Sequence, residues 1–180
     1  MSFTEILLIG IALSMDAFAV CLSSGMVYPG QSRKKKMLLP AAFGIFQGIM
    51  PIGGFFLGSF FASVINRFSG PVALVILGVI GINMIREGIS DEERPEEKSL
   101  TLKTVLFQAV ATSIDAFAVG VSFAAEGTPI FTAAPIIAAT TFILSTAALF
   151  IGEGVGKRLG DRAEILGGAI LIIIGIKAMF

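Results

Sequence analysis

Two aspartates in nearly identical apolar surroundings are the residues of this sequence best suited to chemistry. The segment SMDAFAV covers residues 14–20 and SIDAFAV covers residues 113–119, so Asp16 and Asp115 lie 99 positions apart. An ionised carboxylate within an apolar segment is costly unless a cation or hydrogen bonds compensate its charge. A single such aspartate could be protonated and bonded to a neighbouring helix. Two in equivalent places favour a shared site, whose two negative charges match one divalent cation.

The remaining donors in this sequence favour oxygen coordination. There is no histidine, and Cys21 is the single cysteine. Carboxylate, amide and hydroxyl oxygens suit Mg²⁺, Ca²⁺ and Mn²⁺ better than softer metals. The predicted metal ligands are Asp16, Asp115, Gln47, Ser113 and Thr112.

A wider set of polar residues is predicted to line the path of the substrate. Small residues recur beside both aspartates at helical spacing and allow helices to pack closely around a small ligand. Charged groups near the ends of apolar segments are candidates as well. The predicted pathway residues are Ser23, Ser122, Ser145, Thr146, Asn83, Glu153, Glu164 and Lys177.

The composition indicates that membrane helices position these residues. Hydrophobic residues make up 55% of the chain and charged residues 14%, and the mean hydropathy is +0.91. A membrane-spanning helix needs about 20 apolar residues. We therefore predict an all-α membrane protein with six transmembrane helices, at residues 3–24, 38–62, 69–88, 102–124, 130–153 and 163–180.

This arrangement predicts where the aspartates lie in the membrane. Asp16 and Asp115 each fall near the middle of their segment, and so near the centre of the bilayer. In the second segment, Pro51 with Gly53 and Gly54 could break the helix locally or merely kink it.

The duplicated aspartate motif indicates an internal repeat. We predict a three-helix repeat at residues 1–88, an acidic cytoplasmic linker at 89–99 and a second repeat at 100–180. Weaker similarities join residues 53–58 to 151–156, and 79–83 to 173–177. Because three helices are an odd number, the second repeat must cross the membrane in the opposite sense. Inverted repeats with a midplane site are typical of secondary transporters.

Basic residues predict the orientation of the chain. They concentrate in the loops after the first, third and fifth helices, with a run of four at residues 33–36. Cytoplasmic loops carry the excess of Lys and Arg. We therefore expect these three loops in the cytoplasm of a bacterial cell and both termini outside its inner membrane.

Four motifs together resemble the MntP-type manganese efflux pump family, within the LysE-like exporter superfamily. They are SMDAFAV, SIDAFAVG, FGIFQGIMPIGG at residues 43–54 and RAEILGG at residues 162–168. The resemblance implies a six-helix inner-membrane protein that exports Mn²⁺ through Asp16 and Asp115. It aligns Gln47 with a position where some relatives carry Glu, and Asn83 with a position that is basic in several relatives.

The predicted function is therefore secondary export of Mn²⁺ by proton exchange at the paired aspartates. Manganese is the substrate, no cofactor is expected, and the expected partners are the lipid bilayer and H⁺ rather than nucleic acid. One alternative is a LysE-type amino-acid exporter, whose substrate would also need a basic partner at the midplane. A less favoured alternative is an intramembrane aspartyl protease, which would need both aspartates on adjacent helices and a GxGD-like signature.

Overall fold

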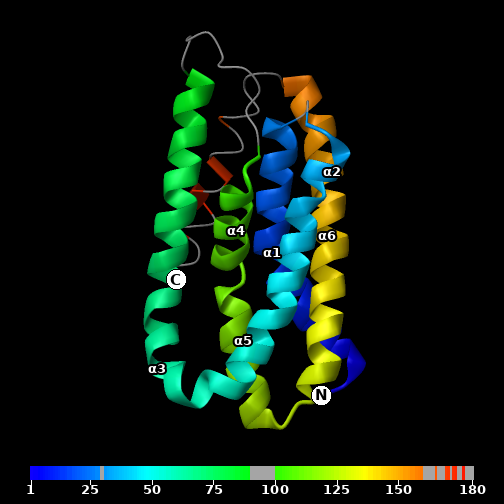
Figure 1. Cartoon of the computed structure of the whole chain (residues 1–180), viewed down its shortest axis with the longest axis vertical. Coiled ribbons are helices and arrows are strands. Elements are labelled where there is room, and N and C mark those ends of the chain that lie inside the picture. The colour runs from blue at the N-terminus through cyan, green and yellow to red at the C-terminus, as the bar shows by residue number, and fades with distance from the viewer. Residues whose placement is uncertain are drawn as a thin grey trace.

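In the computed structural model of this chain, every element in the described part is a helix. The description covers residues 1–28, 31–89 and 100–159, and a few positions beyond: 165, 169–170, 172–173 and 176. Side chains in the second half of the long helix α3 are described at only a few positions. The helices are α1 (Phe3–Val27), α2 (Arg33–Lys36), α3 (Leu38–Ile89), α4 (Leu102–Ala111), α5 (Ile114–Glu126) and α6 (Ile130–Leu159), arranged as an elongated bundle (Figure 1).

Four stretches of the described residues are long and apolar enough to cross a membrane. They are Phe3–Val27, Arg33–Leu57, Leu102–Glu126 and Ile130–Val155. They correspond to the first, second, fourth and fifth segments predicted from the sequence. The sixth predicted segment, 163–180, lies mostly outside the described residues, and so do residues 90–99 of the predicted linker.

The second and third predicted segments belong to one helix. Instead of two helices at 38–62 and 69–88, α3 is helical throughout and bends sharply beyond Leu57 before it returns along the bundle (Figure 1). Gly70 and Pro71 lie in the chain beyond this point, and such residues are where helices kink.

The helix break occurs at a different place from the one considered in the sequence. α3 continues through Pro51, whereas the fourth apolar segment is divided into α4 and α5 at Thr112 and Ser113. The Thr112 hydroxyl donates back to the carbonyl oxygens of Gln108, at 3.0 Å, and Ala109, at 3.3 Å. Back-bonding of this kind bends helices, and here it accompanies the interruption just before Asp115.

Local capping fixes several helix ends. At the start of α1, Ser2 and Glu5 form a reciprocal capping box, with bonds of 2.8 and 3.3 Å. The Thr101 hydroxyl accepts the backbone N–H of Thr104 at the start of α4. α5 ends at Gly127, whose φ of 68° lies in the left-handed region that favours glycine.

Close glycine contacts hold the bundle together. α1 packs mainly on α6, while α3 packs on α5 and α6. A Cβ at Gly25 would overlap the carbonyl oxygen of Leu149, and one at Gly152 would overlap that of Leu22. Small residues allow helix backbones to approach closely in a membrane, where van der Waals contact drives association.

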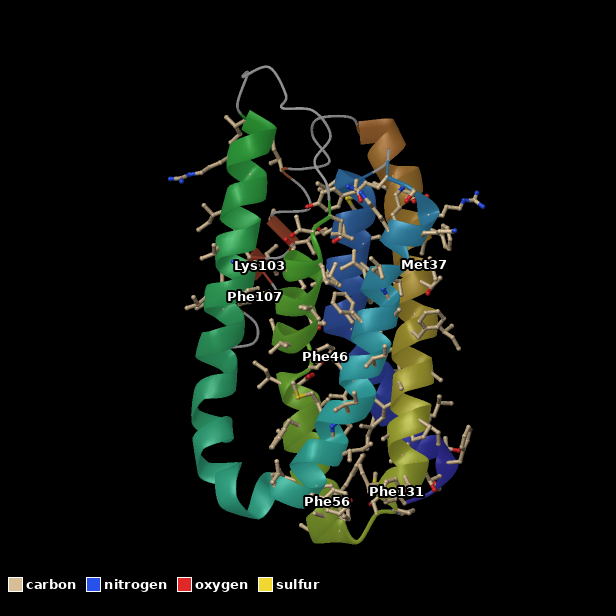
Figure 2. The ribbon with its side chains drawn as sticks, viewed as in Figure 1. Met37, Phe46, Phe56, Lys103, Phe107 and Phe131 are labelled. Carbon is tan, nitrogen blue, oxygen red and sulfur yellow. The ribbon has the colours of Figure 1, made fainter. Side chains whose placement is uncertain are left out.

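The two ends of the bundle differ in chemistry. The short basic helix α2 lies at the same end as the last turns of α3 and α6 and the start of α4 (Figure 1). There Lys36 is buried and forms an ion pair with Glu153 of α6. The opposite end carries Phe56 and Phe131, whose ring centroids are 6.3 Å apart (Figure 2).

The glycine contacts give a direct test of the packing. Replacing Gly152 with Ala is expected to destabilise the protein by about 1–3 kcal/mol, because the added methyl group would collide with the backbone at Leu22. The measurement is the thermal unfolding of the purified protein in detergent. Gly154→Ala, two residues away, is the matched control, because a Cβ there meets nothing within 4 Å. Equal midpoints for the two variants would contradict the close approach of α1 and α6.

Candidate functional site

Two apolar clusters divide the bundle along its length. The first gathers residues at the basic end, and the second gathers residues toward the Phe56 end. On each long helical segment the two clusters occupy separate stretches of sequence. The first cluster contains Ala17, Val20, Cys21, Val27, Leu39, Phe43, Leu100, Val105, Ala109, Ala148 and Leu149. The second contains Ile6, Leu13, Ala116, Phe123, Ile130, Ala133, Ala134 and Ile137.

Polar residues occupy the stretches between these clusters. We call this set the polar layer, and it draws on α1, α3, the α4–α5 junction and α6. Except for the two partly buried aspartates, its members are buried. The polar layer consists of Ser14, Asp16, Gln47, Thr112, Ser113, Asp115, Thr141 and Ser145.

The polar layer brings the two aspartates together. Asp16 lies in the middle of α1 and Asp115 in the first turn of α5, and the two carboxylates are within electrostatic reach of each other. One oxygen of Asp115 accepts the backbone N–H of Ala116 at 2.8 Å. The N-terminal end of a helix also favours negative charge, so the break before α5 creates a suitable place for a carboxylate.

Gln47 connects the backbones that carry the two aspartates. Its side-chain Nε2 donates to the carbonyl oxygen of Leu13, at 3.2 Å, and to that of Thr112, at 2.7 Å. Leu13 and Thr112 lie three residues before Asp16 and Asp115, respectively. Because both acceptors are carbonyls, the orientation of the amide is fixed, and its oxygen must face elsewhere.

Four oxygens of the polar layer have unused hydrogen-bonding capacity as acceptors. Gln47 Oε1, Ser113 Oγ, Thr141 Oγ1 and Ser145 Oγ are buried without an oxygen or nitrogen hydrogen-bond partner in the described part of the chain. Buried polar atoms are normally satisfied, so such oxygens are available to a ligand. Thr141 carries no signal in the sequence, because only its position between the clusters distinguishes it from other hydroxyls on apolar helices.

The other hydroxyl candidates differ in their surroundings. The Thr112 hydroxyl is bonded to its own helix, as described above, and that of Thr146 donates to Phe142 O at 2.7 Å. Ser122 is exposed on α5 and bonds to Ala118 O. Ser23 is buried beyond the layer, and Ser145 lies beside the thiol of Cys21.

The charged residues predicted to line the pathway lie apart from the polar layer or outside the residues that the structure describes. Glu153 lies at the basic end, where it is paired with Lys36. The side chain of Asn83, together with Glu164 and Lys177, lies outside the described residues. Among the residues that are described, no three His, Cys, Asp or Glu side chains converge. The polar layer therefore combines two carboxylates with neutral oxygen donors.

Known proteins resemble this chain over nearly its whole length. The family model described as "Mntp: Putative manganese efflux pump" matches residues 30–179. A protein of Ruminiclostridium cellulolyticum named "Putative manganese efflux pump MntP" is 44% identical over 98% of this chain and 95% of its own length. A Wolinella succinogenes protein, "Putative manganese efflux pump MntP 1", is 45% identical over 97% and 96%.

A third relative has a comparable identity and coverage. A Methanobrevibacter smithii protein with the same MntP name is 39% identical over 99% of this chain and 97% of its own length. No solved structure matches the chain. An efflux pump is a transporter rather than an enzyme, which excludes the protease alternative, and the long apolar helices agree with a multi-pass membrane protein. The chain belongs to the MntP family of manganese efflux pumps.

Proposed function

We propose that this protein exports Mn²⁺ from the bacterial cytoplasm in exchange for protons bound at Asp16 and Asp115. The observation that carries the proposal is the polar layer, in which two carboxylates lie within electrostatic reach between two apolar clusters. The names of the relatives supply manganese as the cation. A hard divalent ion also suits this set of oxygen donors.

The ligands of the cation come from three helical segments in this proposal. Asp16 and Asp115 provide the compensating charge, while Gln47 Oε1 and Ser113 Oγ provide neutral oxygens that have no other partner among the described residues. Thr112 supports the site through its carbonyl oxygen, which holds the Gln47 amide. Thr141 Oγ1 is an additional candidate from α6.

Proton exchange follows from the charge of the site. Without metal, two nearby carboxylates in surroundings of low dielectric repel each other, so they share protons. Mn²⁺ that arrives from the cytoplasm displaces these protons, and protons from outside displace Mn²⁺. Export against the negative interior of the cell needs such a driving ion, because the membrane potential alone pulls cations inward.

Transport runs from the basic end of the bundle toward the opposite end. The basic end of the bundle faces the cytoplasm, by the positive-inside rule, and both termini lie outside the inner membrane. The repeats 1–88 and 100–180, joined by the linker 89–99, alternate access to the polar layer by moving against each other. The opposite directions of α1 and the α4–α5 segment in Figure 1 support this inverted arrangement.

Removing either carboxylate should stop transport. Asp16→Asn and Asp115→Asn are each expected to lower Mn²⁺ uptake into inverted vesicles at least about tenfold, equivalent to about 1.4 kcal/mol, because one of two compensating charges is lost. Glu126→Gln is the matched control, since this carboxylate is exposed at the end of α5. Normal uptake by Asp115→Asn would refute the two-carboxylate mechanism.

The coupling ion can be tested separately with the wild-type protein. Mn²⁺ uptake into proteoliposomes should follow an imposed proton gradient and collapse when a protonophore and an electroneutral K⁺/H⁺ exchanger dissipate it. A pH-sensitive dye inside the vesicles should record proton movement in the opposite direction. Uptake that persists unchanged without a proton gradient would exclude proton exchange while leaving Mn²⁺ transport established.

The bridging amide provides a test of how the site is built. Gln47→Leu is expected to destabilise the protein by about 1–3 kcal/mol, because the carbonyl oxygens of Leu13 and Thr112 lose their shared donor. Thermal unfolding in detergent measures the loss, and Ser122→Ala is the control because its hydroxyl is exposed. An unchanged unfolding midpoint for Gln47→Leu would show that the bridge does not hold the two segments.

A further inference from the structure

Two helix crossings in this structure have the same construction. At the first, Gly25 faces the carbonyl oxygen of Leu149, and Gly152 faces that of Leu22. At the second, Gly120 faces the carbonyl oxygen of Pro51, and Gly54 faces that of Phe117. In both crossings, each helix contributes one glycine and, three residues earlier in the same helix, the carbonyl that the glycine of the other helix faces. The missing side chains of the glycines allow the two backbones to touch. The α1–α6 and α3–α5 crossings are therefore counterparts.

The two crossings are not in equivalent register with the aspartate motifs. On α3 and α6, the counterparts Gly54 and Gly152 are 98 positions apart, close to the spacing of 99 between Asp16 and Asp115. On the aspartate helices, the counterparts Gly25 and Gly120 are only 95 positions apart. The crossing thus lies nine residues beyond Asp16 but five residues beyond Asp115. The difference of four residues is about one helical turn, or ~5.4 Å along the axis.

We propose that this difference is the transport step itself: α1 and α5 each shift by one helical turn along their partners when the protein changes the side to which it opens. In the second state, α1 contacts α6 in the register, counted from its aspartate, that α5 now has on α3, and α5 contacts α3 in the register that α1 now has on α6. The overall architecture is the same in both states. One-turn shifts between packed helices are a known form of conformational switching. This inference rests on the proposed transport function, and it replaces movement of whole repeats by movement of α1 and α5 along α6 and α3.

The exchanged register defines which residues meet in the second state. α1 would contact α6 through Phe18 and Cys21, and α5 would contact α3 through Val121 and Ala124. Cys21 and Ala124 carry a Cβ where Gly25 and Gly120 carry none, so the shifted crossings form at a wider helix separation than the present ones. Ala124 is exposed in the present structure, whereas the shift places it against the backbone of α3.

The shift also explains how access to the polar layer can change. α6 carries members of both apolar clusters and α3 carries Leu39 and Phe43 of the first, while α1 and α5 carry the aspartates together with cluster members of their own. Moving an aspartate helix by one turn changes which residues of α3 and α6 lie next to each carboxylate. The bonds from Gln47 to Leu13 and Thr112 must both exchange during the movement, because the two segments that Gln47 bridges both move relative to α3.

Ala124 is exposed in the present register and lies at the helix crossing in the shifted register, so a large side chain there affects only the shifted state. Ala124→Phe leaves the present state undisturbed, because Ala124 is exposed, and it blocks the shifted crossing by steric overlap. Mn²⁺ uptake into proteoliposomes is expected to fall at least tenfold, while Mn²⁺ binding to the purified protein stays within about threefold of the wild type. Ala125→Phe is the matched control, because it changes the adjacent exposed alanine on another face of α5.

A second measurement follows the shift without relying on transport. In a Cys21→Ala background, the alkylation rate of Ala124→Cys by N-ethylmaleimide is expected to change at least threefold between Mn²⁺-loaded and acidic metal-free conditions. The rate for Ala125→Cys should stay constant. If Ala124→Phe fails to fold, this comparison of alkylation rates still tests whether α5 shifts along α3.

The outcomes separate the shift from the proposed function. If the wild type transports Mn²⁺ and Ala124→Phe transports it equally well, the shift is wrong and the exporter stands. If the wild type carries no Mn²⁺, the proposed function is wrong, and alkylation decides the shift alone. Identical alkylation behaviour at the two alanine positions would overturn the shift in either case.

Discussion

The side-chain amide of Gln47 holds the two aspartate segments of this protein in place. It is buried between helices and donates to the carbonyl oxygens of Leu13 and Thr112. Leaving such buried groups unpaired costs about 1–3 kcal/mol each, so the bonded arrangement is strongly favoured. Because the acceptors precede Asp16 and Asp115 by the same number of residues, one side chain fixes both carboxylates relative to each other. The amide oxygen then faces away from these carbonyls, within the same polar layer.

The surroundings of this amide favour the proposed cation site over a passive polar contact. Apolar clusters close the polar layer toward both ends of the bundle. Hydroxyl and amide oxygens remain unpaired inside it, among the residues that are described. A protein that only needed stability would do better with apolar side chains of similar size at these positions. The Lys36–Glu153 pair adds a charged contact between the two halves of the chain at the basic end.

The parts of this architecture that depend on local sequence could be predicted, and those that depend on neighbours could not. Membrane-spanning segments can be predicted from their length and apolar composition. The duplicated motif predicts that Asp16 and Asp115 form a pair. The helix break illustrates the limit. Proline suggested an interruption at Pro51, whereas α3 stays helical and the fourth segment is interrupted at Thr112 and Ser113. Likewise, Lys36 belongs to a basic run that the sequence marks as exposed, and only its ion pair with Glu153 of α6 distinguishes it from the other three. Thr141 became a candidate only when its depth between the clusters was known.

The main partner of α1 has a consequence for biosynthesis. α1 packs chiefly on α6, and the Lys36–Glu153 pair likewise joins residues 117 positions apart. A ribosome delivers α1 to the membrane well before α6 exists, so the helix that carries Asp16 first resides in lipid without its native neighbour. Asp16 and its helix can therefore be fully buried only after most of the chain has been inserted into the membrane. The first half of the chain, expressed alone, therefore lacks the surface that shelters its own aspartate, and the two halves must mature as one unit.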